Sequence, residues 1–282
     1  MTTPAYDRYD VPGYLGALRR EGELLAAAAE CTPMGAAVPS CPGWAVRDLV
    51  KHTGYVHRWA AGFVTRGLAR PEGGHSEPEV LGQGPGDAEL PGWFREGHAA
   101  LVRALAEAPA DLDCWAFLDA PSPLAFWARR QAHETAIHRA DAERAAAAAE
   151  PAAAAEPAAA AGAAAGPARG AGYEPAFAAD GVDELLMGFL ARNIRRGNWP
   201  GLDGSLAIHA GDGAAGAADW LVTGGAAAPA VSRGSGPADC EVSGPAAGLY
   251  LTLWHRRPPD GLRVTGDPGV LARFGHALRI TW

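Results

Sequence analysis

A glutamate and a histidine four residues apart are the first candidates for chemistry in this sequence. Glu134 and His138 lie in the run PLAFWARRQAHETAIHRADAER, which predicts a helix over about 123–145. Residues four apart lie on one face of a helix, so these two side chains can chelate one divalent metal. The order His133-Glu134-x-x-x-His138 is not the zinc-protease motif HExxH, because the extra residue moves the second histidine to another face.

The same spacing also allows a second interpretation, in which Glu134 and His138 form an exposed, hydrogen-bonded pair flanked by Arg130 and Arg139. His52 favours the metal, because it lies on or beside the apolar stripe of another predicted helix. Two helices of one bundle would then present His52, Glu134 and His138 to the interior. Two imidazoles and one carboxylate suit zinc and leave a fourth position for water or a substrate.

Three further polar residues close to the candidate ligands in the sequence are not expected to bind the metal themselves. His57 follows His52 by five residues and points to another face, and His133 lies about 100° around its helix from the candidate glutamate. We expect both on the surface or supporting the ligands from outside the ligand set. Asp141 follows His138 by three residues and can accept its ring N–H, or it can be a plain helix-surface residue.

The N-terminal part of the chain has the pattern of a helical bundle that could position these ligands. Helical spacing predicts helices over 11–30, after the turn SCPGW, over about 91–108 and over about 123–145. A Gly/Pro-rich acidic segment at 68–90 would be the long crossing loop. The predicted bundle occupies residues 1–146.

The rest of the chain has a different pattern. Residues 147–172 are rich in Ala, Pro and Gly and predict an inter-domain linker. Residues 173–282 predict a small α+β domain. Its predicted helices lie at 180–196, 245–256 and 268–278, and its predicted strands at 205–210, 219–224, 239–244 and 262–266.

Composition excludes several classes of protein. The 282 residues carry a formal charge of −8, spread evenly, so we expect no nucleic-acid partner. The polar N-terminus and the lack of a long apolar run predict a cytoplasmic protein without a membrane segment. The four cysteines, at 31, 41, 114 and 240, form no CxxC pair and predict reduced thiols. The oligomeric state is not indicated.

Three segments resemble the mycothiol-dependent maleylpyruvate isomerase family. They are VPSCPGWAVRDLVKHTGYVHRWA (38–60), RRQAHETAIHRADAE (129–143), and CEVSGPAAGLYLTLWHRR followed by LRVTGDPGVLARF. The resemblance implies a DinB-like four-helix bundle followed by the family's C-terminal domain. It also implies zinc ligands at His52, Glu134 and His138, with mycothiol as a thiolate in the open position. Ala45 departs from the Ser or Thr helix cap common in the family, and the Ala-rich insert is unusual.

The resemblance implies an isomerase that adds the mycothiol thiolate reversibly to maleylpyruvate or a related small electrophile. Two alternatives remain open: a mycothiol S-transferase that keeps the thiol attached, and a non-catalytic metal-binding module. A dianionic substrate needs positive charge, for which Arg58, Arg95 and Arg130 are candidates, although Arg130 also suits a salt bridge with Glu134. Catalytic side chains beyond the metal ligands are not identified by the sequence.

Overall fold

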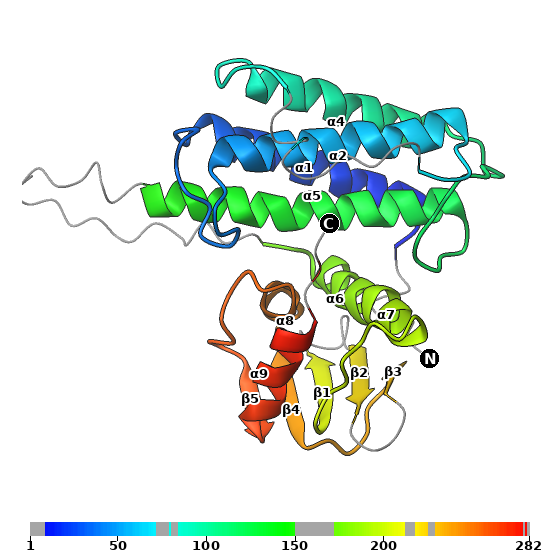
Figure 1. Cartoon of the computed structure of the whole chain (residues 1–282), viewed down its shortest axis with the longest axis vertical. Helices are drawn as coiled ribbons and strands as arrows, with labels where there is room; N and C mark the ends of the chain where they lie inside the picture. Colours follow the sequence, from blue (N-terminus) through cyan, green and yellow to red (C-terminus); the bar gives the residue numbers. More distant parts are fainter. Residues whose placement is uncertain are drawn as a thin grey trace, which may run out of the picture. The chain divides into compact units, whose positions relative to one another are not determined.

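The computed structural model describes most of the chain (Figure 1). Among the described residues, those of 10–149 form one compact unit, and Tyr9 belongs with the residues from 172 onward to a second. Tyr9 is fixed in that second unit by a hydrogen bond from its hydroxyl to Glu174 at 2.5 Å and by its ring packing on Phe177. The described ranges are 9–71, 79, 84–149, 172–211, 218–224, 229–278 and 280.

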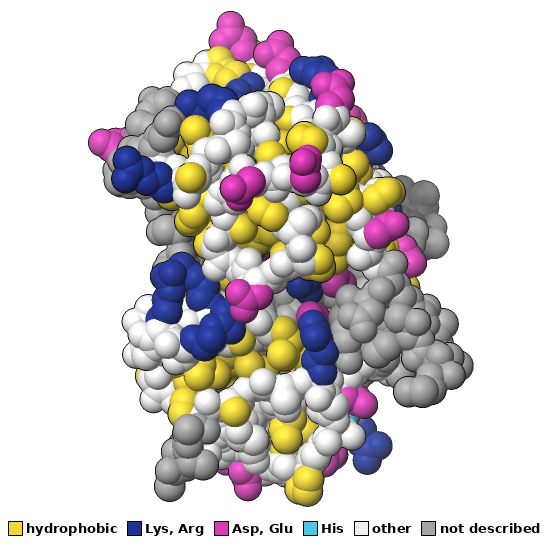
Figure 2. Space-filling view, turned by 90° about the vertical axis from the view of Figure 1, so that its right-hand side faces the viewer, with side chains coloured by type: hydrophobic (Ala, Val, Ile, Leu, Met, Phe, Trp, Pro, Cys, Tyr) yellow, Lys and Arg dark blue, Asp and Glu magenta, His cyan; other side chains and the backbone are white. Residues whose placement is uncertain are grey.

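The first unit is a bundle of long helices, as the sequence predicts (Figure 1). Helix α1 packs against α5 and α4, and α2 packs against α4 and α5. None of the described helices combines the length and apolarity that a membrane crossing requires. Figure 2 shows acidic and basic side chains interspersed on the viewed face of the bundle. The bounds are α1 Val11–Glu30, α2 Val46–Arg66, α4 Leu90–Glu107 and α5 Pro123–Ala149.

Helix α5 runs beyond its predicted end at 145 and beyond the predicted domain boundary at 146. It continues to Ala149, because alanine favours helix and Ala145 is fully buried against the bundle core. The remainder of the predicted linker, from 150 to 171, lies outside the described residues, and so do residues 72–78 and 80–83 of the predicted crossing loop.

A tight turn before α2 sets the start of that helix. The amide of Val38 bonds to the carbonyl of Trp44, and the amide of Val46 bonds to the carbonyl of Ala36. Ala45 offers no side-chain cap, but Asp48 accepts a hydrogen bond from the Ala45 amide at 2.8 Å. The turn and the first turn of α2 therefore form one rigid piece despite the missing Ser or Thr.

Apolar side chains fill the bundle at helical spacing. Leu25 of α1, Leu49 of α2 and Phe94 of α4 are almost completely buried in one cluster that includes Ala142 and Ala145 of α5. Burying a leucine or phenylalanine side chain of this kind stabilises a fold by about 1.5–3 kcal/mol. This packing fixes the separation of α2 and α5, on which any group shared between the two helices depends.

The second unit is the predicted α+β domain. Its described strands form one sheet in the order β3-β2-β1-β4-β5, in which only the β1–β4 pairing is parallel. Helices α8 and α9 pack on β4, and α9 also packs on β1. The elements are α6 Pro175–Asp183, η3 Glu184–Leu190, α7 Ala191–Arg195, β1 Ser205–Ala210, β2 Ala218–Thr223, β3 Ala230–Arg233, β4 Cys240–Gly244, α8 Ala246–Leu253, β5 Arg263–Gly266 and α9 Pro268–Ala277.

Two features of this unit differ from the sequence prediction. The predicted helix at 180–196 starts earlier, at Pro175, and contains a π-helical segment between α6 and α7. Strand β3 was not predicted, because it has four residues, largely exposed, without an apolar alternation. Asp183 joins these parts, since its carboxylate accepts hydrogen bonds from Trp220 of β2 and from Arg233 of β3.

Two histidines are buried side by side in the bundle. The ring centroids of His57 in α2 and His98 in α4 lie 5.2 Å apart. His98 lies directly against Gly22, where a Cβ atom would be 2.2 Å from the imidazole Cε1. Burial lowers the pKa of both rings, and His98 lowers that of His57 further. Because Thr135 donates its hydroxyl proton to the Gln131 carbonyl, His57 Nε2 donates to Thr135 Oγ1 at 2.9 Å.

Acid should destabilise the bundle through this pair. In the folded protein the pKa of both rings lies below about 6.5, the pKa of a histidine in an unfolded chain. As the pH falls past about 6.5, the unfolded chain therefore binds more protons than the folded protein does. The free energy of unfolding should then drop by up to about 1.4 kcal/mol per histidine for each pH unit. Urea titrations of chelator-treated protein at about pH 7.5 and about pH 5 measure the drop. A His57→Gln, His98→Gln variant should lose less stability on acidification, and an equal loss would contradict the assignment.

Candidate metal centre

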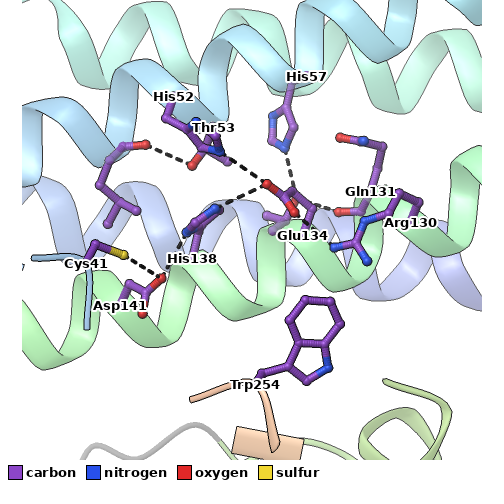
Figure 3. Close-up of polar contacts among 12 residues, drawn as sticks. Cys41, His52, Thr53, His57, Arg130, Gln131, Glu134, His138, Asp141 and Trp254 are labelled. Carbon is purple, nitrogen blue, oxygen red and sulfur yellow. Dashed lines mark hydrogen bonds and ion pairs between the residues drawn. The ribbon is translucent and has the colours of Figure 1, made fainter. Parts of the chain in front are cut away.

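The three predicted ligands converge in the interior of the bundle (Figure 3). His52 comes from α2, whereas Glu134 and His138 come from successive turns of α5. Glu134 Oε1 lies 3.3 Å from His52 Nε2 and 3.2 Å from His138 Nε2. One ligand atom from each residue lies within 4.8 Å of the others, and all three side chains are buried. This arrangement fits a single divalent cation.

The alternative of an exposed Glu134–His138 pair is wrong. Both residues are buried, and so are the arginines expected to flank them. Arg130 donates from Nη2 to Glu134 Oε2 at 2.9 Å, and Arg139 pairs with Glu21 and Glu143. The salt bridge between Arg130 and Glu134 that the sequence allowed is therefore formed inside the protein.

Charge fixes the protonation state of the candidate ligands. Burial by itself raises the pKa of Glu134, but His138, hydrogen bonds from both histidines and the charge of Arg130 together hold it well below its usual range. Burial by itself lowers the pKa of His138, but Glu134 and Asp141 raise it to about 9. The glutamate is therefore an ionised carboxylate, the form that binds metals.

Asp141 orients His138. Its Oδ2 lies 2.9 Å from His138 Nδ1, so the ring donates that proton and turns Nε2 toward Glu134. Ser40 donates to the other carboxylate oxygen at 2.5 Å, and the Cys41 thiol lies 3.6 Å from Oδ2. Asp141 is completely buried, so the alternative of a plain helix-surface residue is wrong.

Trp44 forms a wall beside the two imidazoles. Its ring centroid lies 4.9 Å from that of His52 and 6.3 Å from that of His138, with which it is stacked. The turn that precedes α2 holds this half-buried indole in place. The sequence alone does not point to Trp44 or Ser40 as site residues, although both lie in the SCPGW turn before α2.

The other candidates lie elsewhere. His57 and His133 are completely buried, so neither is a surface residue, and neither belongs to the three-residue group. Arg58 stacks on Trp93 and donates to backbone carbonyls. Arg95 pairs with Glu23 and Glu30 on the bundle surface.

A helical bundle with a buried two-histidine, one-carboxylate centre, followed by an α+β unit, is the class that this fold and site define. Residues 15–143 match the family model described as the mycothiol maleylpyruvate isomerase N-terminal domain, and residues 176–273 match the MDMPI C-terminal domain. The chain therefore belongs to the mycothiol-dependent maleylpyruvate isomerase family, which is an enzyme family.

Solved structures agree with this assignment at the level of the fold. The crystal structure of the mycothiol-dependent maleylpyruvate isomerase has a TM-score of 0.61 and 15% identity, over 94% of this chain and 97% of that chain. The crystal structure of a histidine-to-alanine mutant of that enzyme has a TM-score of 0.60 and 14% identity, and the match covers the same fractions of both chains. Among curated proteins, none matches this chain.

Removing one ligand should release the metal without unfolding the bundle. His52→Ala removes one of three candidate ligands, so we expect metal affinity to fall by more than about 100-fold. Helicity should not change, because the variant keeps the Glu134 pairs with Arg130 and His138. Asp141→Asn should cost about 10–100-fold through the misoriented imidazole. Metal content after dialysis and circular dichroism measure both effects. His209→Ala, which removes a partly exposed histidine of the second unit, is the matched control. Wild-type metal content in His52→Ala would show that the centre is misassigned.

Metal binding should also release a proton. Below about pH 9, metal-free His138 carries protons on both ring nitrogens and is positively charged, and a metal can bind only the neutral ring. Apparent affinity should therefore rise about tenfold per pH unit from neutral pH toward about pH 9. Calorimetry at about pH 7 in buffers of different ionisation enthalpy counts the protons. A binding enthalpy independent of the buffer would contradict this protonation state.

Proposed function

We propose that this chain is a zinc- and mycothiol-dependent isomerase that acts on maleylpyruvate or a related small electrophile. The single observation that carries the proposal is the buried group of His52, Glu134 and His138, whose ligand atoms lie within 4.8 Å of one another. Membership of the mycothiol-dependent family supports the thiol cofactor.

The donor set is the reason for proposing zinc. Two imidazole nitrogens and one carboxylate oxygen are a ligand set that zinc uses in catalytic sites, where a fourth position stays open. Three of the features such a site needs are present in this chain. Glu134 is ionised, His138 has an oriented ring, and the carboxylate of Asp141 lies behind that ring.

The chemistry would be reversible addition to a double bond. Zinc bound by these residues would lower the pKa of a coordinated thiol, so that thiolate is available at neutral pH. The cis double bond of the substrate would become single on thiolate addition, rotate, and form again in the trans arrangement as the thiolate leaves. No atom is gained or lost overall, so the reaction needs no oxidant or reductant.

The chain's own residues would keep the centre in one geometry during this cycle. Arg130 binds Glu134 Oε2 and so directs Oε1 toward the two imidazoles. Asp141 retains the proton on His138 Nδ1, which prevents the ring from turning. Trp44 covers His52 and His138 and limits the approach of water from that side.

The three candidate arginines of the bundle already have partners, so none of them is proposed to supply the positive charge that a dianionic substrate needs. Arg130 is engaged by Glu134, Arg58 by Trp93 and backbone carbonyls, and Arg95 by surface carboxylates. A mycothiol S-transferase would use the same centre, because it differs only in retaining the added thiol.

An assay with mycothiol and maleylpyruvate tests the proposal. The wild type should form the trans isomer catalytically, and activity should vanish without the thiol or after chelation. Proton NMR distinguishes the isomer from a conjugate, which a generic electrophile would form if the protein is a transferase. His52→Ala should lower turnover by more than about 100-fold, whereas His209→Ala should not change it. Turnover without any added thiol, or turnover unchanged by His52→Ala, would overturn the proposal.

A further inference from the structure

The second unit contains a pocket that plays no part in the candidate metal centre. It encloses about 360 Å³ between α8, β5 and α9. This volume lies within the range of roughly 300–1,000 Å³ that small-molecule sites occupy. Leu253 and Phe274 are buried residues that line it, together with the partly buried Val264 and Leu271. The pocket can therefore cover an apolar body of moderate size.

All charged or titratable side chains that line this pocket are basic. They are His255, Arg257 and His276, and no acidic residue lines it. The chain as a whole carries a formal charge of −8, so this grouping opposes the overall balance. Arg257 is anchored by a hydrogen bond from Nη2 to the Asp260 carbonyl at 2.6 Å, which accounts for one of the five guanidinium N–H groups.

Two carboxylates adjoin lining residues along the chain, Asp260 after Pro259 and Asp267 before Pro268. Asp267, just before the lining residue Pro268, accepts from the Gly269 amide at 2.8 Å and pairs with Arg273. It caps α9, where its charge is balanced locally. Neither Asp260 nor Asp267 is itself a lining residue of the pocket.

The backbone keeps one of these basic side chains in a position that favours glycine. His255 has φ 62°, the only positive value of a non-glycine among the described residues. It follows the end of α8, where the amides of His255 and Arg256 bond to the carbonyls of Thr252 and Leu251. This is the Schellman pattern, whose left-handed residue is usually glycine. A side chain kept in a strained position is a pointer to function.

The imidazole of His255 is held at the pocket wall. Its Nε2 lies 2.8 Å from the Leu278 carbonyl, to which it donates. Gly275 of α9 lies beside the ring, where a Cβ atom would make an ordinary van der Waals contact of 3.4 Å with the imidazole Cε1. The left-handed backbone of His255 and the hydrogen bond to Leu278 together fix the position of this imidazole.

We propose that this pocket binds a small amphipathic carboxylate, with its apolar body against Leu253 and Phe274 and its carboxylate at Arg257 and His276. A guanidinium group and an imidazole N–H both donate hydrogen bonds to carboxylates, and an apolar floor rejects a bare inorganic anion. The inference does not depend on the metal centre or on the proposed isomerase activity.

Octanoate is the probe, and full-length protein labelled with ¹⁵N is the sample. Amide shifts of Val264, Leu271 and Ala272 should change saturably with octanoate, because these residues line the pocket. Octanol, which keeps the apolar body without the charge, should bind at least about tenfold more weakly. An Arg257→Ala, His276→Ala variant should weaken octanoate binding by the same factor. Arg263→Ala, an exposed arginine of β5 that does not line the pocket, should bind as the wild type does.

The proposal would be overturned by the absence of saturable shifts at these amides, by equal binding of octanol and octanoate, or by unchanged binding in the double variant. Inorganic phosphate binding as tightly as octanoate would likewise exclude the amphipathic ligand. If the double variant fails to fold by circular dichroism, Arg257→Gln, which retains most of the side-chain stem, takes its place with the same expected loss.

Discussion

The buried carboxylate of Glu134 is the interaction on which the arrangement of the bundle depends. An ionised carboxylate inside a protein is unfavourable unless cations and hydrogen-bond donors surround it. Here Arg130 takes one oxygen, and the two histidines face the other. His52 comes from a different helix, so this group links α2 to α5 and requires their separation to be held by the apolar packing around it.

That requirement explains why α5 is polar and yet buried. Beyond the residues of the centre, His133, Thr135 and Arg139 are also inside, each with partners on the neighbouring helices or within α5 itself. Arg139 reaches Glu21 of α1, and Thr135 meets His57 of α2. All residues from 130 to 142 of this helix are buried. Several of its polar side chains form a connected layer, in which the side-chain amide of Gln131 is an exception without a hydrogen-bond partner among the described residues.

For this reason the sequence points to the three candidate ligands more directly than to their surroundings. Spacing at three and four residues locates His52, Glu134 and His138, because metal chelation depends on geometry that a helix fixes locally. The burial of His133 and Arg139 depends instead on partners in α1, which lie more than a hundred residues away in the sequence. Periodicity assumes that polar residues mark the solvent side, and α5 violates that assumption.

In the second unit, too, some elements can be predicted from the sequence and others depend on contacts between distant residues. The strands with buried alternation, such as β1 and β2, are recognisable from the sequence, whereas the short β3 is defined only by pairing with β2. The end of α8 is a further case, because His255 takes a left-handed conformation that sequence rules reserve for glycine. Local propensity fails at such points because tertiary contacts decide the backbone.

Charge balance connects the structure of the centre to its proposed chemistry. Without a metal, the carboxylates of Glu134 and Asp141 are balanced by Arg130 and by the proton of His138, whose pKa is about 9. A divalent cation that replaces this single proton would leave the buried group with one extra positive charge. Such an excess is unfavourable in a low-dielectric interior, so an anionic fourth ligand would bind more strongly than a neutral one. A thiolate has this charge, and a neutral thiol does not. The residues proposed to hold the metal would therefore also favour the deprotonated, reactive form of the proposed thiol cofactor.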